Sequence, residues 1–250
     1  MTGWIVIAGL GPGNDALVTP EAQDALDQAT DIVGYIPYVE RVQPRDGLTL
    51  HPSDNRVELD RSRHALEMAS QGKRVVVVSS GDPGVFAMAA AVLEAVEHGD
   101  PNWRDLDIRI LPGITAMLAA SAACGAPLGH DFCTINLSDN MKPWAIIEKR
   151  LQLAAQADFA MAFYNPRSKS RPEGFEKALA LLQRECNDAR PIIFARNVSR
   201  PDQTIKIVPL NEATPDMADM RTVVILGSSR TRIIARAGAP LVYTPRSIPE

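Results

Sequence analysis

Runs rich in β-branched residues alternate with amphipathic segments along the whole chain, and this alternation constrains the fold more than any other feature. The strand candidates are residues 4–8, 31–34, 74–79, 107–111, 132–136, 159–164, 191–195, 203–208 and 222–226. The helix candidates are residues 20–29, 57–70, 86–97, 115–123, 144–155 and 172–186. Such alternation is typical of α/β proteins whose parallel or mostly parallel sheets are covered by helices.

The chain length favours two domains, because a domain usually holds about 100–200 residues and this chain has 250. The pattern restarts after Leu111-Pro112-Gly113, and the segment from 203 to 226 is typical of paired strands rather than of a further strand, helix and strand unit. We therefore expect an N-terminal α/β domain over residues 1–112 and a C-terminal α/β domain over residues 113–250.

The first glycine loop, GLGPG at 9–13, follows a strand candidate and could cradle a pyrophosphate. Three features argue against this. Pro12 has no amide hydrogen to donate, the next helix start is at Thr19-Pro20 rather than at the loop, and the second strand ends at Gly34-Tyr35 without an acid for a ribose. A nucleotide-dependent oxidoreductase or binding module stays as the alternative reading, and the glycines could instead let a bulky ligand approach the backbone.

Two more loops follow strand candidates, SGDPGVF at 80–86 and PGITA at 112–116. Open α/β sheets bind ligands where strands end, so these loops predict a binding edge. Asp82 could instead cap the next helix, and Thr115 could be only a helix N-cap.

Composition excludes several classes of function. Hydrophobic residues make up 46% of the chain and charged residues 22%, and a net charge of -4 gives little support for nucleic-acid binding. Cys124, Cys133 and Cys186 are too few and too far apart for a disulfide framework or a metal knuckle. The N-terminus does not resemble a signal peptide, and the apolar run at 114–126 is shorter than the ~20 residues that span a bilayer. We expect a cytoplasmic protein without a metal site, membrane segment or nucleic-acid partner.

In their order and spacing, the three loops resemble those of the tetrapyrrole methylase family of S-adenosylmethionine-dependent enzymes. The resemblance continues through LSD at 137–139, FYNPRS at 163–168, RN at 196–197 and TVVILG at 222–227, so it covers nearly the whole chain. The stretches GYIPYV at 34–39 and GAPLGHDF at 125–132 are most similar to members that contract the macrocycle as they methylate it.

The resemblance implies two α/β domains with an active-site cleft between them, the tetrapyrrole methylase fold, and a homodimer. It also implies S-adenosyl-L-methionine as co-substrate and S-adenosyl-L-homocysteine as product, in a site that needs no phosphate cradle. The cofactor-binding residues that it implies are Pro12, Gly81, Asp82, Val85, Phe86, Thr115, Ala116, Tyr164, Asn165, Arg196, Asn197 and Thr222.

The implied substrate is a tetrapyrrole with many carboxylate groups, which arginine binds well because its planar fork matches a carboxylate. Two basic clusters are candidates for binding it: Arg167, Lys169 and Arg171 in one, Arg230 and Arg232 in the other. Either cluster could also be an ordinary solvated surface. Tyr35 and Tyr38 could stack on the macrocycle, or could be core or interface aromatics.

Methyl transfer from a sulfonium needs alignment and exclusion of water rather than a protein nucleophile. Ring contraction would begin with removal of a hydroxyl proton, for which His130, Asp131 and Asp139 are the general-base candidates. Each could instead belong to a turn or a helix cap. The sequence leaves open whether the macrocycle carries cobalt.

Overall fold

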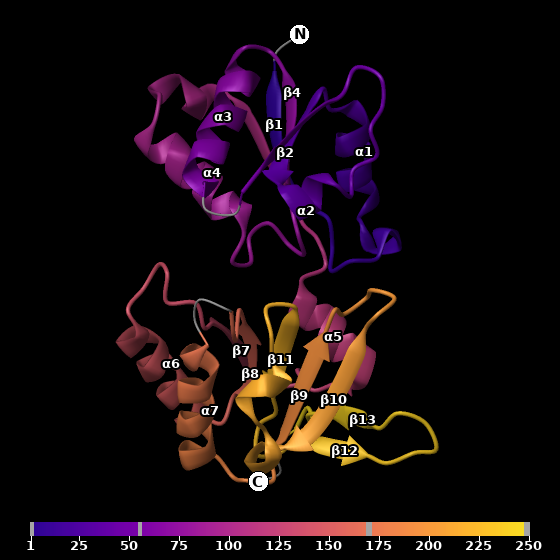
Figure 1. Ribbon diagram of the computed structural model, residues 1–250, viewed down its shortest axis with the longest axis vertical. Coiled ribbons are helices and arrows are strands. Elements are labelled where there is room, and N and C mark those ends of the chain that lie inside the picture. The colour runs from indigo at the N-terminus through magenta and orange to yellow at the C-terminus, as the bar shows by residue number, and fades with distance from the viewer. Residues whose placement is uncertain (1–2, 55–56, 169–171, 248–250) are drawn as a thin grey trace. The chain divides into compact units, whose positions relative to one another are not determined.

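The structure is a computed structural model that describes residues 3–54, 57–168 and 172–247 (Figure 1). The chain divides into two compact units, Met1–Thr115 and Ala116–Glu250. The boundary falls in the segment that joins the strand ending at Leu111 to the helix beginning at Ala116. No helix in the described part of the chain is both long and apolar enough to span a bilayer.

The first unit is built on a five-stranded sheet in the order β3-β2-β4-β1-β5, and every neighbouring pair is parallel. The strands are β1 (Trp4–Gly9), β2 (Asp31–Tyr35), β3 (Thr49–Ser53), β4 (Arg74–Ser79) and β5 (Asp107–Leu111). Its helices are α1 (Pro20–Gln28), α2 (Ile36–Val39), α3 (Glu58–Ser70) and α4 (Met88–His98), with the 3-10 turns η1 (Asp15–Leu17) and η2 (Pro101–Asp105). The expected parallel sheet is confirmed.

Helices cover both faces of this sheet, with α3 and α4 on one side and α1 on the other (Figure 1). Successive residues of β4 therefore enter different cores: Val75 and Val77 pack with the α3 and α4 side, and Val76 and Val78 with the α1 side. Burial on both faces explains why β1 and β4 are continuous apolar runs. The predicted helix start is confirmed, because the Thr19 hydroxyl accepts the Ala22 amide at 3.2 Å.

The second unit contains a mixed sheet in the order β10-β9-β11-β8-β7. The strands are β7 (Phe132–Asn136), β8 (Ala160–Tyr164), β9 (Pro191–Arg196), β10 (Thr204–Pro209) and β11 (Thr222–Leu226). The helices are α5 (Ala116–Cys124), α6 (Trp144–Gln156) and α7 (Glu173–Glu185), with the 3-10 turns η3 (Leu210–Glu212) and η4 (Pro215–Met217). Within this sheet β7 and β8 pair in parallel, whereas β9 pairs antiparallel with β10 and β11, and β11 also pairs antiparallel with β8, so the expectation of mostly parallel pairing is wrong for this sheet.

The sequence suggested that the last two strand candidates pair with each other, but in the structure they do not. Strand β9 lies between β10 and β11 and pairs with both, because η3 and η4 carry the chain from one side of β9 to the other. Helices α6 and α7 lie side by side along this sheet (Figure 1). Its core contains Phe163 of β8 with the buried Leu151, Phe175 and Leu182 of the two helices.

A small three-stranded sheet completes the second unit and was not expected from the sequence. It has the order β12-β13-β6, with β6 at Gly125–Ala126, β12 at Arg232–Ile234 and β13 at Leu241–Tyr243. Strands β13 and β6 pair in parallel, and the Thr244 hydroxyl donates to the Pro127 carbonyl at 2.6 Å. Strands of two or three residues with exposed faces carry little periodicity, so the sequence pattern does not reveal them.

Candidate functional site

The three glycine loops meet where β1, β4 and β5 end. We call this carboxyl end of the first sheet its edge. Gly11 and Gly81 exchange amide to carbonyl hydrogen bonds of 3.2 and 2.9 Å. The Asp82 carboxylate accepts the Gly84 amide at 2.8 Å and the Gly113 amide at 3.1 Å. Asp82 therefore does not cap α4, whose N-cap is Ala87. It joins the second loop to the third.

Glycine is required in these loops because the backbones touch. A Cβ on Gly9 would lie 2.5 Å from the Gly81 carbonyl oxygen, and a Cβ on Gly113 would overlap the same oxygen. Gly11 has a φ of +65°, a conformation that favours glycine. Packing of loop against loop, rather than access for a ligand, accounts for Gly9 and Gly113.

The amides of the first loop have little left to offer a phosphate. The Leu10 amide donates to the Ser79 carbonyl at 2.8 Å, the Gly11 amide is committed to Gly81, and Pro12 is buried and has no amide hydrogen. Helix α1 begins only at Pro20, after η1, so its positive end lies away from the loop. The geometry supports a ligand without a pyrophosphate at this edge.

The second loop also presents apolar surface at the same edge. Phe86 is 48% exposed and has a φ of +53°, which is uncommon for a bulky residue. Val85 before it is half-buried, and Thr115 after β5 is buried. An aromatic ring held exposed by an unfavourable backbone conformation is typical of a functional position.

Tyr35 and Tyr38 lie beside these loops, at the end of β2 and in α2. Their rings meet edge to face with centroids 5.3 Å apart and planes at 87°. Both are half-buried, and Tyr38 packs against the core on the α1 side of the sheet. The structure thus brings the tyrosine pair to the same edge of the first unit as the glycine loops.

The second unit has a matching edge, where β7, β8 and β9 end and β11 begins. The Tyr164 hydroxyl accepts the Met117 amide in the first turn of α5 at 3.0 Å, which places Ala116 beside it. Asn165 has a φ of +51°, and its side-chain amide donates to the Asn136 side-chain oxygen at 3.1 Å. Asn136 thereby holds Asn165 in its left-handed conformation.

Two acids organise the rest of this edge. The Asp219 carboxylate accepts Arg196 Nε at 2.8 Å and the Thr222 hydroxyl at 2.7 Å, and Arg196 and Thr222 are register partners of β9 and β11. Asp202 accepts the Asn197 side-chain amide at 2.6 Å. The charge of Arg196 is therefore balanced within the protein.

Asp219 is ionised in this arrangement. Partial burial raises the pKa of Asp219. The hydrogen bonds from Arg196, Thr222 and the Arg221 amide lower the pKa and outweigh the effect of burial, so it lies below its ordinary value of 3.8. At neutral pH the carboxylate keeps both side chains in place.

Other predicted residues are not brought to this edge. His130 and Asp131 precede β7, at the opposite end from Asn136, and a five-residue strand separates its ends by roughly 13 Å. Arg230 and Arg232 follow the other end of β11, where the Ser229 amide donates to Asp158 ahead of β8 at 2.9 Å.

Two members of the predicted sets do lie at this edge. Asp139 follows β7, and Arg167 follows β8 and is half-buried. Lys169 and Arg171 lie outside the residues that the structure describes.

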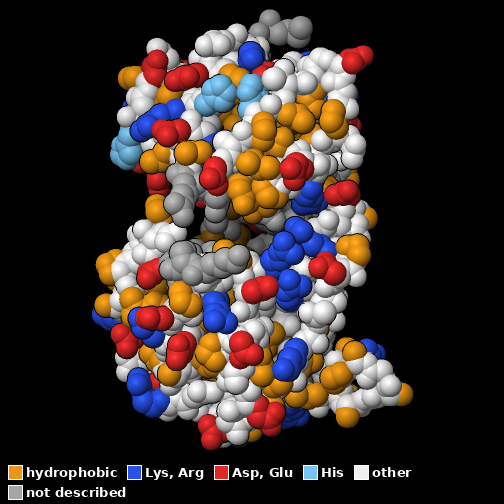
Figure 2. Space-filling view, in the orientation of Figure 1, with side chains coloured by type: hydrophobic (Ala, Val, Ile, Leu, Met, Phe, Trp, Pro, Cys, Tyr) orange, Lys and Arg blue, Asp and Glu red, His pale blue; other side chains and the backbone are white. Residues whose placement is uncertain are grey.

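A separate polar cluster lies at the other end of the first sheet. Asp31 is buried, and its Oδ1 lies 2.8 Å from His51 Nε2 and 2.9 Å from Lys73 Nζ. His51 in turn stacks edge to face with His64, and Figure 2 shows histidine side chains together on this unit. Within the described ranges, no group of three or more His, Cys, Asp or Glu side chains could hold a metal ion.

Sequence reasoning missed Asn136, Asp202 and Asp219. Asp219 had a local signal, because an aspartate often closes a turn by accepting the amide two residues on, here that of Arg221 at 2.9 Å. Asp202 binds the Asn197 side chain and Asn136 binds the Asn165 side chain, and no motif around Asp202 or Asn136 predicts these contacts.

The chain belongs to the tetrapyrrole methylase family, because the model for Tetrapyrrole (Corrin/Porphyrin) Methylases matches residues 5–214. The resemblance predicted from the loops is confirmed. Over 247 residues the chain is 51% identical to precorrin-3B C(17)-methyltransferase from Sinorhizobium sp, a match that covers 98% of this chain and 97% of that protein.

Two further similarities extend over nearly the full length. A crystal structure of the methyltransferase CobJ superposes with a TM-score of 0.93 at 66% identity, covering 97% of this chain and all of that one. The probable cobalt-factor III C(17)-methyltransferase of Salmonella typhimurium is 37% identical over 247 residues, which is 96% of this chain and 97% of that protein. The expected α/β fold class is confirmed.

Proposed function

We propose that the chain transfers a methyl group from S-adenosyl-L-methionine to carbon 17 of precorrin-3B and contracts the ring to precorrin-4, a step of cobalamin biosynthesis. The observation that carries the proposal is the 51% identity to the Sinorhizobium enzyme across 98% of this chain. We include a homodimer in the proposal on the basis of the family resemblance.

The residues at the two edges fit a cofactor that lacks phosphate. The first edge supplies Pro12, Gly81, Asp82, Val85, Phe86 and Thr115, and the second supplies Ala116, Tyr164, Asn165, Arg196, Asn197 and Thr222. Amides that a pyrophosphate would need are committed to other loops, whereas Phe86 offers exposed apolar surface for a purine. When bound, S-adenosyl-L-methionine supplies a methyl group already activated by the sulfonium.

For the macrocycle we propose Tyr35 and Tyr38 as stacking residues and Arg167 as a carboxylate partner, together with Lys169 and Arg171 of the same basic stretch. Arg230 and Arg232 lie at the other end of β11, so they have no place in this set. Arg196 Nε already pairs with Asp219, so we keep Arg196 in the cofactor set and do not propose it as an anchor for the carboxylates of the macrocycle.

The chain's own residues have three tasks in the reaction: to orient the macrocycle, to exclude water and to accept a proton. Of the three general-base candidates, Asp139 is the one at the edge that holds Tyr164 and Asn165. We propose that its carboxylate accepts the hydroxyl proton whose loss starts ring contraction.

The test incubates the protein with S-adenosyl-L-methionine and precorrin-3B under anaerobic and aerobic conditions. We expect S-adenosyl-L-homocysteine and a product heavier by one methyl group, identified by mass spectrometry. Absence of both products with intact protein would reject methyl transfer.

The cobalt-loaded substrate is the second candidate, because the Salmonella protein with that name is 37% identical over nearly its whole length. Parallel assays with metal-free and cobalt-loaded macrocycle separate the two. We expect faster turnover of the metal-free substrate, since identity to the Sinorhizobium enzyme is higher.

A further inference from the structure

The carbonyls of the first glycine loop have a partner that lies outside the loops. Arg41 Nη2 donates to the Leu10 carbonyl at 2.7 Å, and Nη1 lies 3.5 Å from the Gly11 carbonyl oxygen. Arg41 Nη2 is also 3.1 Å from Asp15 Oδ1, in the turn that follows the loop. One guanidinium thus contacts the loop at its start, at its left-handed glycine and just beyond its end.

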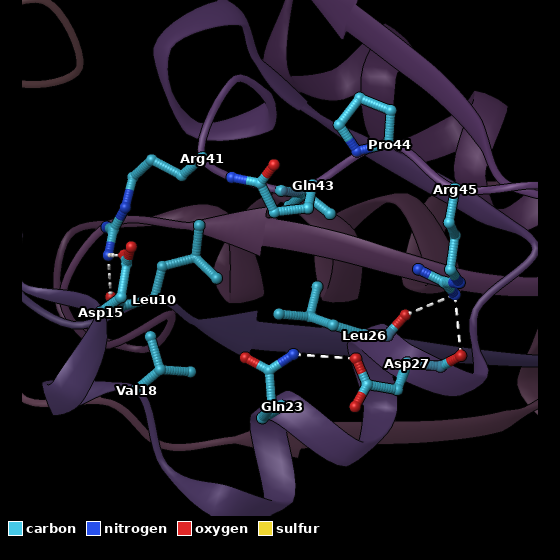
Figure 3. A pocket seen from close by; sticks show the side chains of 11 residues that line it. Leu10, Asp15, Val18, Gln23, Leu26, Asp27, Arg41, Gln43, Pro44 and Arg45 are labelled. Carbon is cyan, nitrogen blue, oxygen red and sulfur yellow. Dashed lines mark hydrogen bonds and ion pairs between the residues drawn. The ribbon is translucent and has the colours of Figure 1, made fainter.

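The arginine reaches the loop along the wall of a cavity of about 250 Å³ (Figure 3). Leu10, Val18, Leu26 and Val42 line this cavity with apolar side chains. The Arg41 side chain, only 16% exposed, lines this cavity together with Asp15 and Leu10 of the loop region. Without the guanidinium, the Leu10 carbonyl would lose this donor, whereas the Gly11 carbonyl would keep the Gly81 amide at 2.9 Å.

Arg41 is itself held by the element that carries the tyrosine pair. Its amide donates to the Tyr38 carbonyl at 3.2 Å, directly after α2. The same residue therefore connects the helix of Tyr38 to the glycine loop, and through the Gly11 and Gly81 bridge to the loop of Asp82.

We propose that Arg41 is a positioning residue for S-adenosyl-L-methionine: it keeps the glycine loop, and with it Pro12 and Gly81, in the conformation that binds the cofactor. The inference rests on the proposed function, but it assigns a role to a residue outside the proposed cofactor-binding set. Arg41→Gln removes the charge and the fork, whereas Arg41→Lys keeps the charge but replaces the planar fork of two nitrogens by a single one.

Arg45 provides a matched control from the same cavity. Its Nη2 donates to the carbonyls of Leu26, Asp27 and Ala29, each at 2.8 Å, at the end of α1 (Figure 3). Arg45→Gln therefore removes the same kind of guanidinium to carbonyl bonds from the same unit without touching the glycine loop. A purely structural role for these arginines predicts similar effects of both substitutions.

The experiment compares wild type, R41Q, R41K and R45Q by calorimetry with S-adenosyl-L-homocysteine, by steady-state kinetics and by hydrogen exchange. We expect R41Q to weaken binding and raise KM for the cofactor roughly tenfold or more, with a smaller change in kcat, R41K to be intermediate, and R45Q to stay within about twofold of wild type. The amides of Leu10, Gly11 and Gly81 should exchange faster in R41Q than in R45Q.

Equal effects of R41Q and R45Q on binding, or unchanged exchange of these amides in R41Q, would overturn the inference. Hydrogen exchange needs no activity, so it tests whether Arg41 holds the glycine loop even if the wild type binds no S-adenosyl-L-homocysteine. A wild type that binds no S-adenosyl-L-homocysteine would reject the proposed function and, with it, the cofactor role of Arg41. Normal binding by both the wild type and R41Q would reject the inference alone.

Discussion

At the scale of single residues, Asp219 determines how three groups at the second edge are arranged. Its carboxylate accepts Arg196, the Thr222 hydroxyl and the Arg221 amide. A carboxylate has acceptor sites for all three donors, whereas an amide in the same position would turn an NH₂ group toward one of them. The side chains proposed to bind the cofactor therefore depend on a residue with no proposed ligand contact.

Asp219→Asn should impair cofactor binding more than folding. We expect KM for S-adenosyl-L-methionine to rise roughly five- to twentyfold, because Arg196 and Thr222 lose a shared anchor. The Asp219 side chain is 46% exposed, so the loss of unfolding free energy should be about 1 kcal/mol or less. Kinetics and urea unfolding measure both, with Glu212→Gln, an exposed acid of the same segment, as control. A large stability loss with unchanged KM would contradict the assignment.

Asp31 should make stability depend on acidic pH. Burial raises the pKa of Asp31, but hydrogen bonds from His51, Lys73 and Thr30 outweigh this, so the pKa lies below its ordinary value of 3.8. A lowered pKa in the folded state means that the stabilisation is complete above 3.8 and is lost as pH falls through the lowered value.

Asp31→Asn should therefore be less stable than wild type by about 1–3 kcal/mol at neutral pH, because the donors that meet at the buried carboxylate lose their shared acceptor. The difference should shrink as the pH falls below the ordinary value of 3.8. Urea unfolding at both pH values measures it, and a constant difference would show that the Asp31 charge is not the cause.

At the scale of elements, three strands of the first sheet end in loops that depend on one another. The bridge between Gly11 and Gly81 and the bonds of Asp82 link the ends of β1, β4 and β5. Loops whose linked residues lie seventy (Gly11 and Gly81) and 31 (Asp82 and Gly113) residues apart thus form one structural unit, and a change in any loop should affect the others.

Gly113→Ala tests this dependence. Its Cβ would overlap the Gly81 carbonyl oxygen, so one of the two loops must move. We expect a loss of about 1–3 kcal/mol in unfolding free energy and weaker binding of S-adenosyl-L-homocysteine. Gly238→Ala, where a Cβ would meet nothing within 4 Å, should change stability by less than about 0.5 kcal/mol. Equal stability of the two variants would mean that the loops can separate freely.

Most helices and inner strands could be predicted from the sequence, because burial on defined faces produces a periodic pattern. Strand β3 could not: its residues TLHPS include a proline and alternate poorly, which an edge strand tolerates. Strands β12 and β13 are short and form part of an exposed hairpin, so their pairing leaves almost no pattern.

For the candidate site, motifs identified residues at strand ends, but not the residues that hold them. Tyr164 and Asn165 follow a strong apolar strand and were predicted from the FYNPRS motif. Arg41 acts on carbonyls about thirty residues away, a contact set by the tertiary fold that has no sequence periodicity. The same motif reasoning selected His130, which lies just before β7. The candidate site lies at the opposite end of that strand, beside Asn136.

At the scale of the whole molecule, each unit has its own sheet and its own buried core. Ligand binding should be visible as added stability, since a ligand that binds only folded protein shifts the unfolding equilibrium.

S-adenosyl-L-homocysteine at 100 times its Kd should raise the unfolding free energy by about 2.7 kcal/mol and increase Tm. NAD at the same concentration should leave Tm unchanged, because the Leu10 and Gly11 amides of the first glycine loop already have partners and Pro12 has no amide hydrogen. Differential scanning calorimetry measures both. Stabilisation by NAD alone would favour the nucleotide-binding alternative.

The parallel pair of β6 and β13 also bears on how the protein is made. All five strands of the first sheet come from residues 4–111, so that sheet can form while the rest of the chain is still being translated. Strand β6 at residue 125 must wait for Leu241–Tyr243 to leave the ribosome before it has its parallel neighbour. The nascent second unit is therefore incomplete until β13, more than a hundred residues after β6, has emerged.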